Sequence, residues 1–190
     1  MKNILLILAH PDKNSISSRL LDIYGQEAQR MGHAIRIIRL GDLSFDLNLS
    51  KGYKGVQDLE PDLKKSQEDI LWADHLVFAF PIWWYIFPAI LKGFIDRVFL
   101  PGFAFKYKEN SPMPDKLLKG KTADIICTSG APKVFYFFKG GNVGPKLLQN
   151  ILKFCGIKTN KKILFGSLSQ KPSDTKMKMM EGRVVRSVIK

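Results

Sequence analysis

The stretch that decides the fold is Asn3-Ile-Leu-Leu-Ile-Leu-Ala9, followed at once by the polar turn His10-Pro-Asp-Lys-Asn-Ser-Ile-Ser-Ser18. A continuous apolar run of strand length is typical of a strand that is buried on both faces of a parallel sheet. Apolar residues then recur at helical spacing from Ile16 to Met31, behind a serine-rich start and before Gly32. Ala34 to Leu40 predicts a second strand, so the chain opens with a strand–helix–strand unit.

The same alternation continues to the end of the chain, after a polar loop from Gly41 to Glu60. The predicted elements are a helix from Pro61 to about Trp72, a strand from His75 to Phe80, a helix from Pro88 to about Leu100, a long connection over 102–120, a strand from Thr122 to Thr128, a helix from about Val143 to Phe154, a strand from Lys162 to Leu168 and a basic amphipathic helix from about Ser173. Strands that alternate with helices predict an α/β fold, with a parallel sheet covered on both faces. Five strands fit the doubly wound, flavodoxin-like order 2-1-3-4-5, and 190 residues suit a single domain over 1–190.

Composition and charge exclude several classes of protein. The two cysteines, Cys127 and Cys155, are far apart and flanked by apolar residues, so we expect buried free thiols and neither a zinc site nor a disulfide. A net charge of +13 is compatible with a protein that binds nucleic acids. No basic helix with an RNA-binding aromatic signature and no zinc finger accompanies the lysines, so we expect no specific nucleic-acid binding. Attraction of anionic cofactors and peripheral docking on an acidic surface both stay open.

No apolar segment of the sequence is long enough to cross a bilayer without charge. The first run, Ile4 to Ala9, is also too short for the apolar region of a signal peptide. We therefore expect a soluble, cytoplasmic protein with no membrane insertion. The predicted helix from Pro88 to Leu100 is apolar nearly all round, which we interpret as surface that a partner subunit covers.

Ligands of an open α/β sheet bind at the carboxyl ends of its strands, near the point where the strand order reverses. The first turn to meet there is His10 to Ser18, which lacks the glycine motifs of dinucleotide turns and P-loops. Its hydroxyls, its imidazole and the free N–H groups of a helix start suit a phosphate group. The alternative is that Ser15 or Ser17 only caps the helix, and different serines can fill both roles.

Two further turns belong to the same edge. Pro81-Ile-Trp-Trp-Tyr-Ile-Phe87 offers aromatic faces and backbone amides to a large planar ligand such as a flavin ring, and it suits a hydrophobic subunit interface equally well. Thr128-Ser-Gly-Ala-Pro132 is a turn of small residues that permits close backbone approach, and its N–H groups can stabilise negative charge on a reduced flavin. Tyr136 follows and can donate a hydrogen bond to the same region; otherwise this is only a tight connection.

Four segments together resemble the NAD(P)H:quinone oxidoreductase family, including the bacterial drug-activity modulators and the ancillary flavoproteins of potassium-efflux systems. They are Ala9-His10 with Ser15-Ile-Ser17, Phe80-Pro-Ile-Trp-Trp-Tyr85 with Pro88-Ala-Ile-Leu-Lys-Gly-Phe-Ile-Asp-Arg-Val-Phe99, Gly102-Phe-Ala-Phe105, and Phe154-Cys-Gly156. The resemblance covers nearly the whole chain in the same order, and the stretch from 80 to 99 is its most specific part.

The resemblance implies a role for each group of residues. His10, Ser15, Ile16 and Ser17 would hold the phosphate and ribityl region of a flavin, and Pro81, Ile82, Trp83, Trp84 and Tyr85 would contact its ring. Thr128, Ser129, Gly130 and Ala131 would bracket the other edge of the ring, with Tyr136 as the catalytic polar group. Phe105 and Tyr107 would reach toward the partner's active site across a homodimer. No metal is implied.

Two departures from the family pattern bear on the chemistry. The family's Thr-Thr-Gly-Gly turn reads Thr128-Ser-Gly-Ala131, and the histidine that follows the tyrosine in the animal enzymes corresponds to Asn142, which argues against a Tyr–His proton relay. The chain lacks the C-terminal extension of the animal enzymes, which favours FMN over FAD.

The function implied is an NAD(P)H dehydrogenase (quinone). NADPH or NADH would give a hydride to the flavin and leave, and the flavin would pass both electrons to a quinone-like acceptor in a ping-pong reaction. Two other functions stay open: a regulatory flavoprotein of a potassium-efflux transporter and a flavodoxin-type electron carrier.

Overall fold

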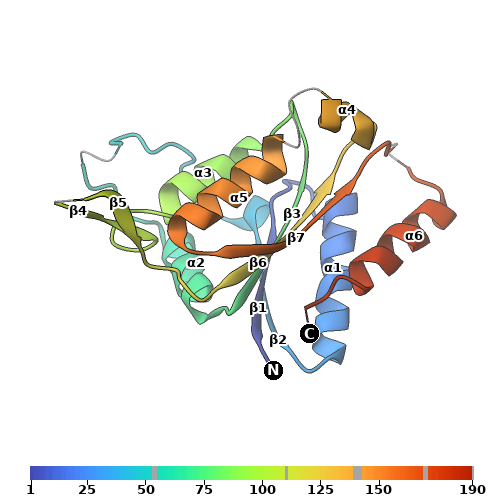
Figure 1. Cartoon of the computed structure of the whole chain (residues 1–190), viewed down its shortest axis with the longest axis horizontal. Coiled ribbons are helices and arrows are strands. Elements are labelled where there is room, and N and C mark those ends of the chain that lie inside the picture. The colour runs from blue at the N-terminus through green and yellow to red at the C-terminus, as the bar shows by residue number, and fades with distance from the viewer. Residues whose placement is uncertain (53–54, 110, 139–142, 169–170, 190) are drawn as a thin grey trace.

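The computed structural model describes residues 1–52, 55–109, 111–138, 143–168 and 171–189. Its main feature is a parallel sheet of order β2-β1-β3-β6-β7, which confirms the predicted flavodoxin-like order when the strands of this sheet are counted along the chain (Figure 1). The strands are β1 (Asn3–Leu8), β2 (Ala34–Arg39), β3 (His75–Pro81), β6 (Thr122–Thr128) and β7 (Lys158–Phe165). The strand order reverses beside β1, so the carboxyl ends of β1, β3 and β6 lie next to one another.

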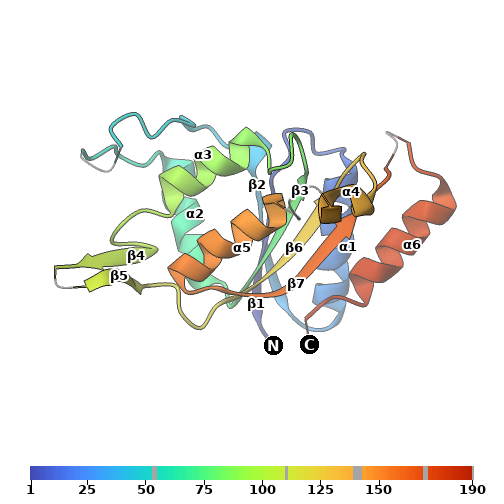
Figure 2. The same ribbon diagram turned by 45° about the horizontal axis from the view of Figure 1, so that its top comes forward.

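Helices cover both faces of the sheet, as Figure 2 shows. Alternate residues of β1 divide the core: Leu5 and Ile7 pack with α2 (Pro61–Trp72), α3 (Ala89–Val98) and α5 (Val143–Cys155). Leu6 and Leu8 pack on the other face with α1 (Ile16–Arg30) and α6 (Asp174–Val185). The continuous apolar run at the start of the chain is therefore explained by a strand with a core on each side. No helix in the described part of the chain is long and apolar enough to span a membrane.

The apolar surface of α3 is covered within the chain itself. Residues 45–47 of the loop before α2 lie against this helix, with the Phe45 and Phe94 rings 6.4 Å apart and Leu47 close to Gly93. Arg97, whose side chain is fully buried, donates to the carbonyl oxygens of Asp46 and Asp58 and to the carboxylate of Glu60. The apolar surface of this helix therefore gives no reason to expect a partner subunit, and our interpretation was wrong on that point, because the loop covers the surface. The homodimer itself stays a prediction.

The structure contains four elements that the sequence did not predict, besides small shifts of boundaries. The connection over 102–120 holds an antiparallel hairpin of β4 (Phe105–Lys108) and β5 (Ser111–Lys116), which projects away from the sheet (Figure 1). A 3₁₀ turn, η1 (Leu40–Asp42), follows β2, and a short helix, α4 (Lys133–Phe138), follows β6. β7 begins at Lys158, four residues before the predicted start, and ends at Phe165. Both cysteines are free and buried, as predicted.

Candidate functional site

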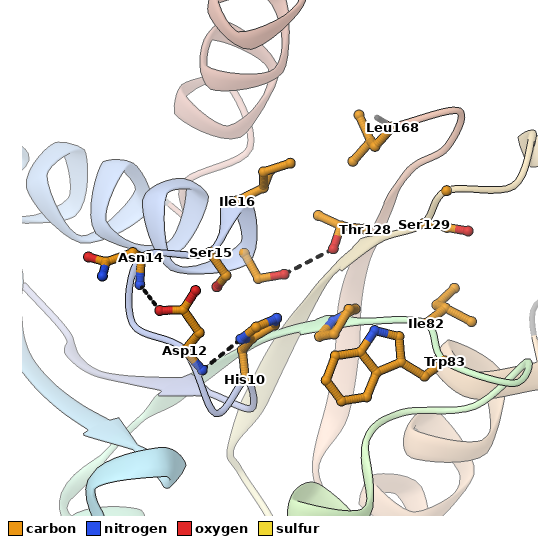
Figure 3. Close-up of a pocket in the computed structure, with 13 residues that line it drawn as sticks. His10, Asp12, Asn14, Ser15, Ile16, Ile82, Trp83, Thr128, Ser129 and Leu168 are labelled. Atoms are coloured by element: carbon orange, nitrogen blue, oxygen red, sulfur yellow. Dashed lines mark hydrogen bonds between the residues drawn. The ribbon is translucent and has the colours of Figure 1, made fainter. Parts of the chain in front are cut away.

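A cavity of about 500 Å³ lies at the carboxyl ends of β1, β3 and β6, where the strand order reverses (Figure 3). This is the position that an open α/β sheet offers to ligands, and the volume suits a mononucleotide-sized molecule. The residues that line the cavity are His10, Asp12, Asn14, Ser15, Ile16, Ser17, Pro81, Ile82, Trp83, Thr128, Ser129, Gly130 and Leu168. All three turns that the sequence singled out therefore meet in one place.

The start of α1 forms one wall of the cavity. Ser15 is the N-cap residue, and its hydroxyl oxygen accepts a hydrogen bond from the Ser18 N–H at 3.2 Å. This confirms the alternative that Ser15 caps the helix. The turn before it is closed by Asp12, whose carboxylate accepts from the Asn14 N–H at 2.8 Å. The N–H groups of Ile16 and Ser17 at the first two helical positions have no partner in the described residues. Capping and anion binding are therefore both available at this helix start.

His10 is held in a defined tautomer next to this helix start. The Asp12 N–H donates to His10 Nδ1 at 2.8 Å, which leaves Nε2 to carry the proton of the neutral ring. Burial lowers the pKa of His10 below its ordinary value, and Asp12 offsets only part of that effect. The ring meets Trp83 edge to face, with the centroids 5.5 Å apart. At neutral pH this side chain is therefore an uncharged hydrogen-bond donor in the wall of the cavity.

Hydroxyl groups link the helix start to the turn after β6. Ser17 and Thr128 are buried, and their hydroxyl oxygens are 3.0 Å apart, as the dashed line in Figure 3 marks. One O–H forms this bond, so the pair keeps one further O–H to donate. The Ser129 hydroxyl lies 2.5 Å from that of Tyr136 and also accepts from the Ala131 N–H. Tyr136 thus stands behind Ser129, buried, and reaches the cavity only through it.

The aromatic loop forms the opposite wall and ends in a strained turn. Trp83 and Ile86 exchange both backbone hydrogen bonds, at 2.9 and 3.0 Å, around the two central residues Trp84 and Tyr85. Both central residues have positive φ, 49° and 71°, a conformation that bulky side chains rarely adopt. Trp83 faces the cavity, whereas the Trp84 side chain is 93% exposed and Tyr85 stacks on Phe135.

The structure brings together ten of the residues that the sequence selected for cofactor binding, namely His10, Ser15, Ile16, Ser17, Pro81, Ile82, Trp83, Thr128, Ser129 and Gly130. Trp84, Tyr85 and Ala131 were selected as well but do not line the cavity. Asp12, Asn14 and Leu168 line it and were missed. Asp12 and Asn14 could have been found from the sequence, since both belong to the first turn. Leu168 lies after the end of β7, and its N–H donates a hydrogen bond to the Ser129 carbonyl oxygen.

Two sequence predictions outside the cavity have different outcomes. Phe105 is buried in its own chain against Phe154 and Tyr107, so its ring is not free to reach a partner. Tyr107 is 64% exposed on the hairpin and keeps that predicted role. Asn142, in the position of the animal enzymes' histidine, lies outside the described residues.

Comparison with known proteins gives a family profile, curated relatives and solved structures that resemble this chain. The profile of the family described as having a flavodoxin-like fold matches residues 2–185. NAD(P)H dehydrogenase [quinone] 1 of Cavia porcellus is 28% identical over 96% of this chain and 74% of its own length. An uncharacterised NAD(P)H oxidoreductase of Haemophilus influenzae is 30% identical over 87% of this chain and 84% of its own. An FMN-dependent NADH-azoreductase of Bacillus anthracis, solved with FMN, shares the fold with a TM-score of 0.74 at 19% identity, covering 98% of this chain and 97% of its own.

The sheet order, the cavity at its reversal point and the profile match define an α/β protein of flavodoxin-like fold. Within that fold, the chain belongs to the NAD(P)H:quinone oxidoreductase family.

Proposed function

We propose that this chain is a flavin-dependent NAD(P)H dehydrogenase (quinone) that binds FMN in the cavity at the start of α1. The observation that carries the proposal is the convergence of three turns on that cavity: a helix start with unpaired N–H groups, an aromatic wall and a turn of small residues. The names of the two relatives support the activity, and the FMN of the azoreductase supports the choice of cofactor.

The donors at the two ends of the cavity fit the two ends of FMN. The unpaired N–H groups of Ile16 and Ser17, the neutral imidazole of His10 and the positive end of α1 suit the phosphate. At the other end, a Cβ added to Gly130 would meet, among the described residues, only the Leu168 carbonyl oxygen, at 3.6 Å, so a ring can approach the Gly130 backbone closely. The Gly130 N–H has no partner in the described residues and is available to such a ring. The residues present therefore suit a flavin mononucleotide.

When bound, the flavin supplies the transfer of a hydride and of an electron pair. The chain orients it and adjusts the electrostatics around it. Trp83 lines one side of the cavity and would contact a bound flavin there, while the Gly130 N–H would stabilise negative charge on its ring. The Tyr136 hydroxyl is held by Ser129 and passes its hydrogen bond to the cavity through that serine. This arrangement needs no histidine behind the tyrosine.

The remaining parts of the proposal concern the reaction order and the surroundings. We infer a ping-pong order, because one cavity serves both the nicotinamide donor and the quinone-like acceptor. We also infer a cytoplasmic homodimer in which the exposed Tyr107 of one subunit approaches the cavity of the other. Chemical cross-linking and sedimentation of the purified protein test the dimer.

Purification followed by spectroscopy and kinetics tests the function. We expect a yellow protein that releases FMN on denaturation, identified by mass, and that oxidises NADPH or NADH with menadione as acceptor. Parallel lines in double-reciprocal plots at several acceptor concentrations would support the ping-pong order. A protein that binds FMN without steady-state NAD(P)H oxidation would favour the carrier or the regulatory flavoprotein, and a colourless protein that cannot be reconstituted would refute the proposal.

A further inference from the structure

A second hollow, of about 380 Å³, lies at the opposite end of the sheet from the cavity. It is lined by Lys116, Lys119, Gln149, Lys153, Gly156, Ile157, Lys158 and Thr159. Lys158 pairs with Thr122 at the first residues of β7 and β6, whereas the cavity contacts Thr128 at the last residue of β6. The hollow is thus separated from the cavity by the length of a strand, and its occupancy is independent of the proposed function.

Positive charge gathers in this hollow without compensation. Its lining contains the four lysines and no carboxylate, and none of the four ammonium groups has a hydrogen bond or ion pair in the described residues. Other lysines of the chain do pair with acids, as in Lys65–Asp69, Lys92–Asp96 and Lys108–Asp115. The charge of Lys119 helps to lower the pKa of Asp115, but the Asp115 carboxylate forms its ion pair with Lys108. Like charges brought together in this way repel, so an anion that bridges them would relieve the repulsion.

The lining also holds two neutral polar side chains, Thr159 and Gln149. The Thr159 hydroxyl oxygen is buried and has no hydrogen-bond partner among the described residues, so it offers no donor to the open space of the hollow. It lies next to the irregularity in β7 between the pairings with Ala123 and Asp124. Bulges of this kind re-aim side chains near sites. The side-chain oxygen of Gln149, Oε1, accepts a hydrogen bond from Lys162 Nζ, which leaves the side-chain NH₂ group of Gln149 as a donor.

The one reactive side chain nearby is inert. Burial raises the pKa of the Cys155 thiol to about 11, and Lys116 offsets only part of that rise, so no thiolate forms at neutral pH. The hollow therefore offers binding and no covalent chemistry.

We propose that this hollow binds a free oligophosphate, a soluble ligand that carries at least two adjacent phosphate groups. A single phosphate has too little charge and too few oxygens for four ammonium groups, whereas a pyrophosphate unit presents a charge of about −3 at neutral pH to the whole set. A volume of about 380 Å³ suits a small molecule, whereas a long polymer would need a continuous groove.

Calorimetric titration of the flavin-loaded protein with inorganic pyrophosphate tests the proposal, since the bound cofactor then occupies the phosphate position at α1. We expect saturable binding of one pyrophosphate per chain that weakens as salt rises. The double variant Lys119→Gln/Lys153→Gln should bind about twenty-five-fold more weakly, about fivefold for each lysine. The matched control Lys64→Gln/Lys178→Gln changes two exposed lysines whose ammonium groups make no hydrogen bond or ion pair within the described residues, and it should differ from the unmodified protein by less than about twofold.

Thermal unfolding provides a second measurement on the same proteins. Without pyrophosphate, the variant in the hollow should be at least as stable as the control, because two repelling charges are gone; with pyrophosphate, only the control should gain stability. Equal weakening in both variants would show binding to net charge and would overturn the proposal. So would unchanged affinity in the hollow variant, no binding at all, or tighter binding to vesicles that contain phosphatidylinositol bisphosphate than to pyrophosphate. If the purified protein carries no flavin, the same titration of the unmodified protein and both variants still tests whether the hollow binds pyrophosphate, independently of the proposed function.

Discussion

The hydroxyl bridge between Ser17 and Thr128 joins the start of α1 to the end of β6, and its removal has a calculable effect. The two oxygens are 3.0 Å apart, with Ser17 1% and Thr128 6% exposed. Thr128→Val keeps the shape of the side chain but leaves the Ser17 hydroxyl buried without its partner, which costs about 1–3 kcal/mol of the free energy of unfolding. Ser17→Ala has the converse effect of similar size.

A double-mutant cycle isolates the bridge. Once either hydroxyl is absent, removal of the second costs little, so the double variant should be about 1 kcal/mol more stable than the sum of the single effects. Urea unfolding of the flavin-free proteins, followed by circular dichroism, measures the free energies. A coupling below about 0.3 kcal/mol would refute the bridge, because independent sites give that value.

The same variants report on the cofactor. The bridge keeps one O–H to donate, and only the double variant Ser17→Ala/Thr128→Val removes it, because either single variant leaves the other hydroxyl free. Loss of a hydrogen bond to a charged group costs about 1.5–3 kcal/mol, so the dissociation constant of FMN should rise at least about tenfold in the double variant. Thr122→Val is the control, since that hydroxyl bonds His75 Nδ1 at 2.7 Å at the far end of the same strand. It should destabilise the fold and leave FMN affinity unchanged; an equal loss of affinity in both variants would contradict a direct role.

Three further predictions concern the loop over α3 and the histidine of the cavity. Arg97→Ala should lower the free energy of unfolding by about 3 kcal/mol in urea, because Glu60 and two loop carbonyls lose a fully buried guanidinium. Gly93→Ala should cost about 1–3 kcal/mol and speed proteolysis of the 41–60 loop, because the added Cβ would stand 2.7 and 2.8 Å from Leu47 atoms. His10 has a lowered pKa, so the folded state binds fewer protons there than the unfolded state; stability should fall as pH drops below 6.5, and less so in His10→Gln.

Each of these has a direct check. Lys92→Ala removes an exposed ion pair from the same helix as Arg97 and should change stability by less than about 0.5 kcal/mol; an equal loss in both would contradict the role of burial. For Gly93→Ala, an unchanged cleavage rate would show that the loop does not depend on this contact. Urea unfolding at about pH 7.5 and about pH 5.5 tests His10, and the same decline in wild type and His10→Gln would assign the effect to other groups.

The central strands of the sheet could be predicted from the sequence because they have a core on each side. The runs from Ile4 and His75 are apolar without interruption, and no other element fits such a pattern. The β4–β5 hairpin was not predicted because β5 contains Pro112 and Pro114. Proline argues against a strand unless the strand lies at the edge of a sheet. The early start of β7 escaped as well, since lysines at its exposed edge obscure the apolar alternation.

The candidate site was predictable to the extent that it depends on strand ends. Turns that follow β1, β3 and β6 must meet, so His10, Trp83 and Gly130 could be grouped before their distances were known. Which residue of a turn faces inward depends on backbone conformation, and positive φ at Trp84 and Tyr85 turned both away from the cavity. Leu168 depends on a long loop with no periodic pattern.

The turn at Trp84 and Tyr85 also affects how this protein can be made more stable. Two-residue turns of this geometry favour Asn-Gly, since each bulky residue at positive φ costs about 1–2 kcal/mol. A selection for thermal stability alone would therefore replace both aromatic residues first. Heat resistance and the exposed aromatic surface next to Trp83 depend on the same two positions, so engineering of this protein has to choose between them.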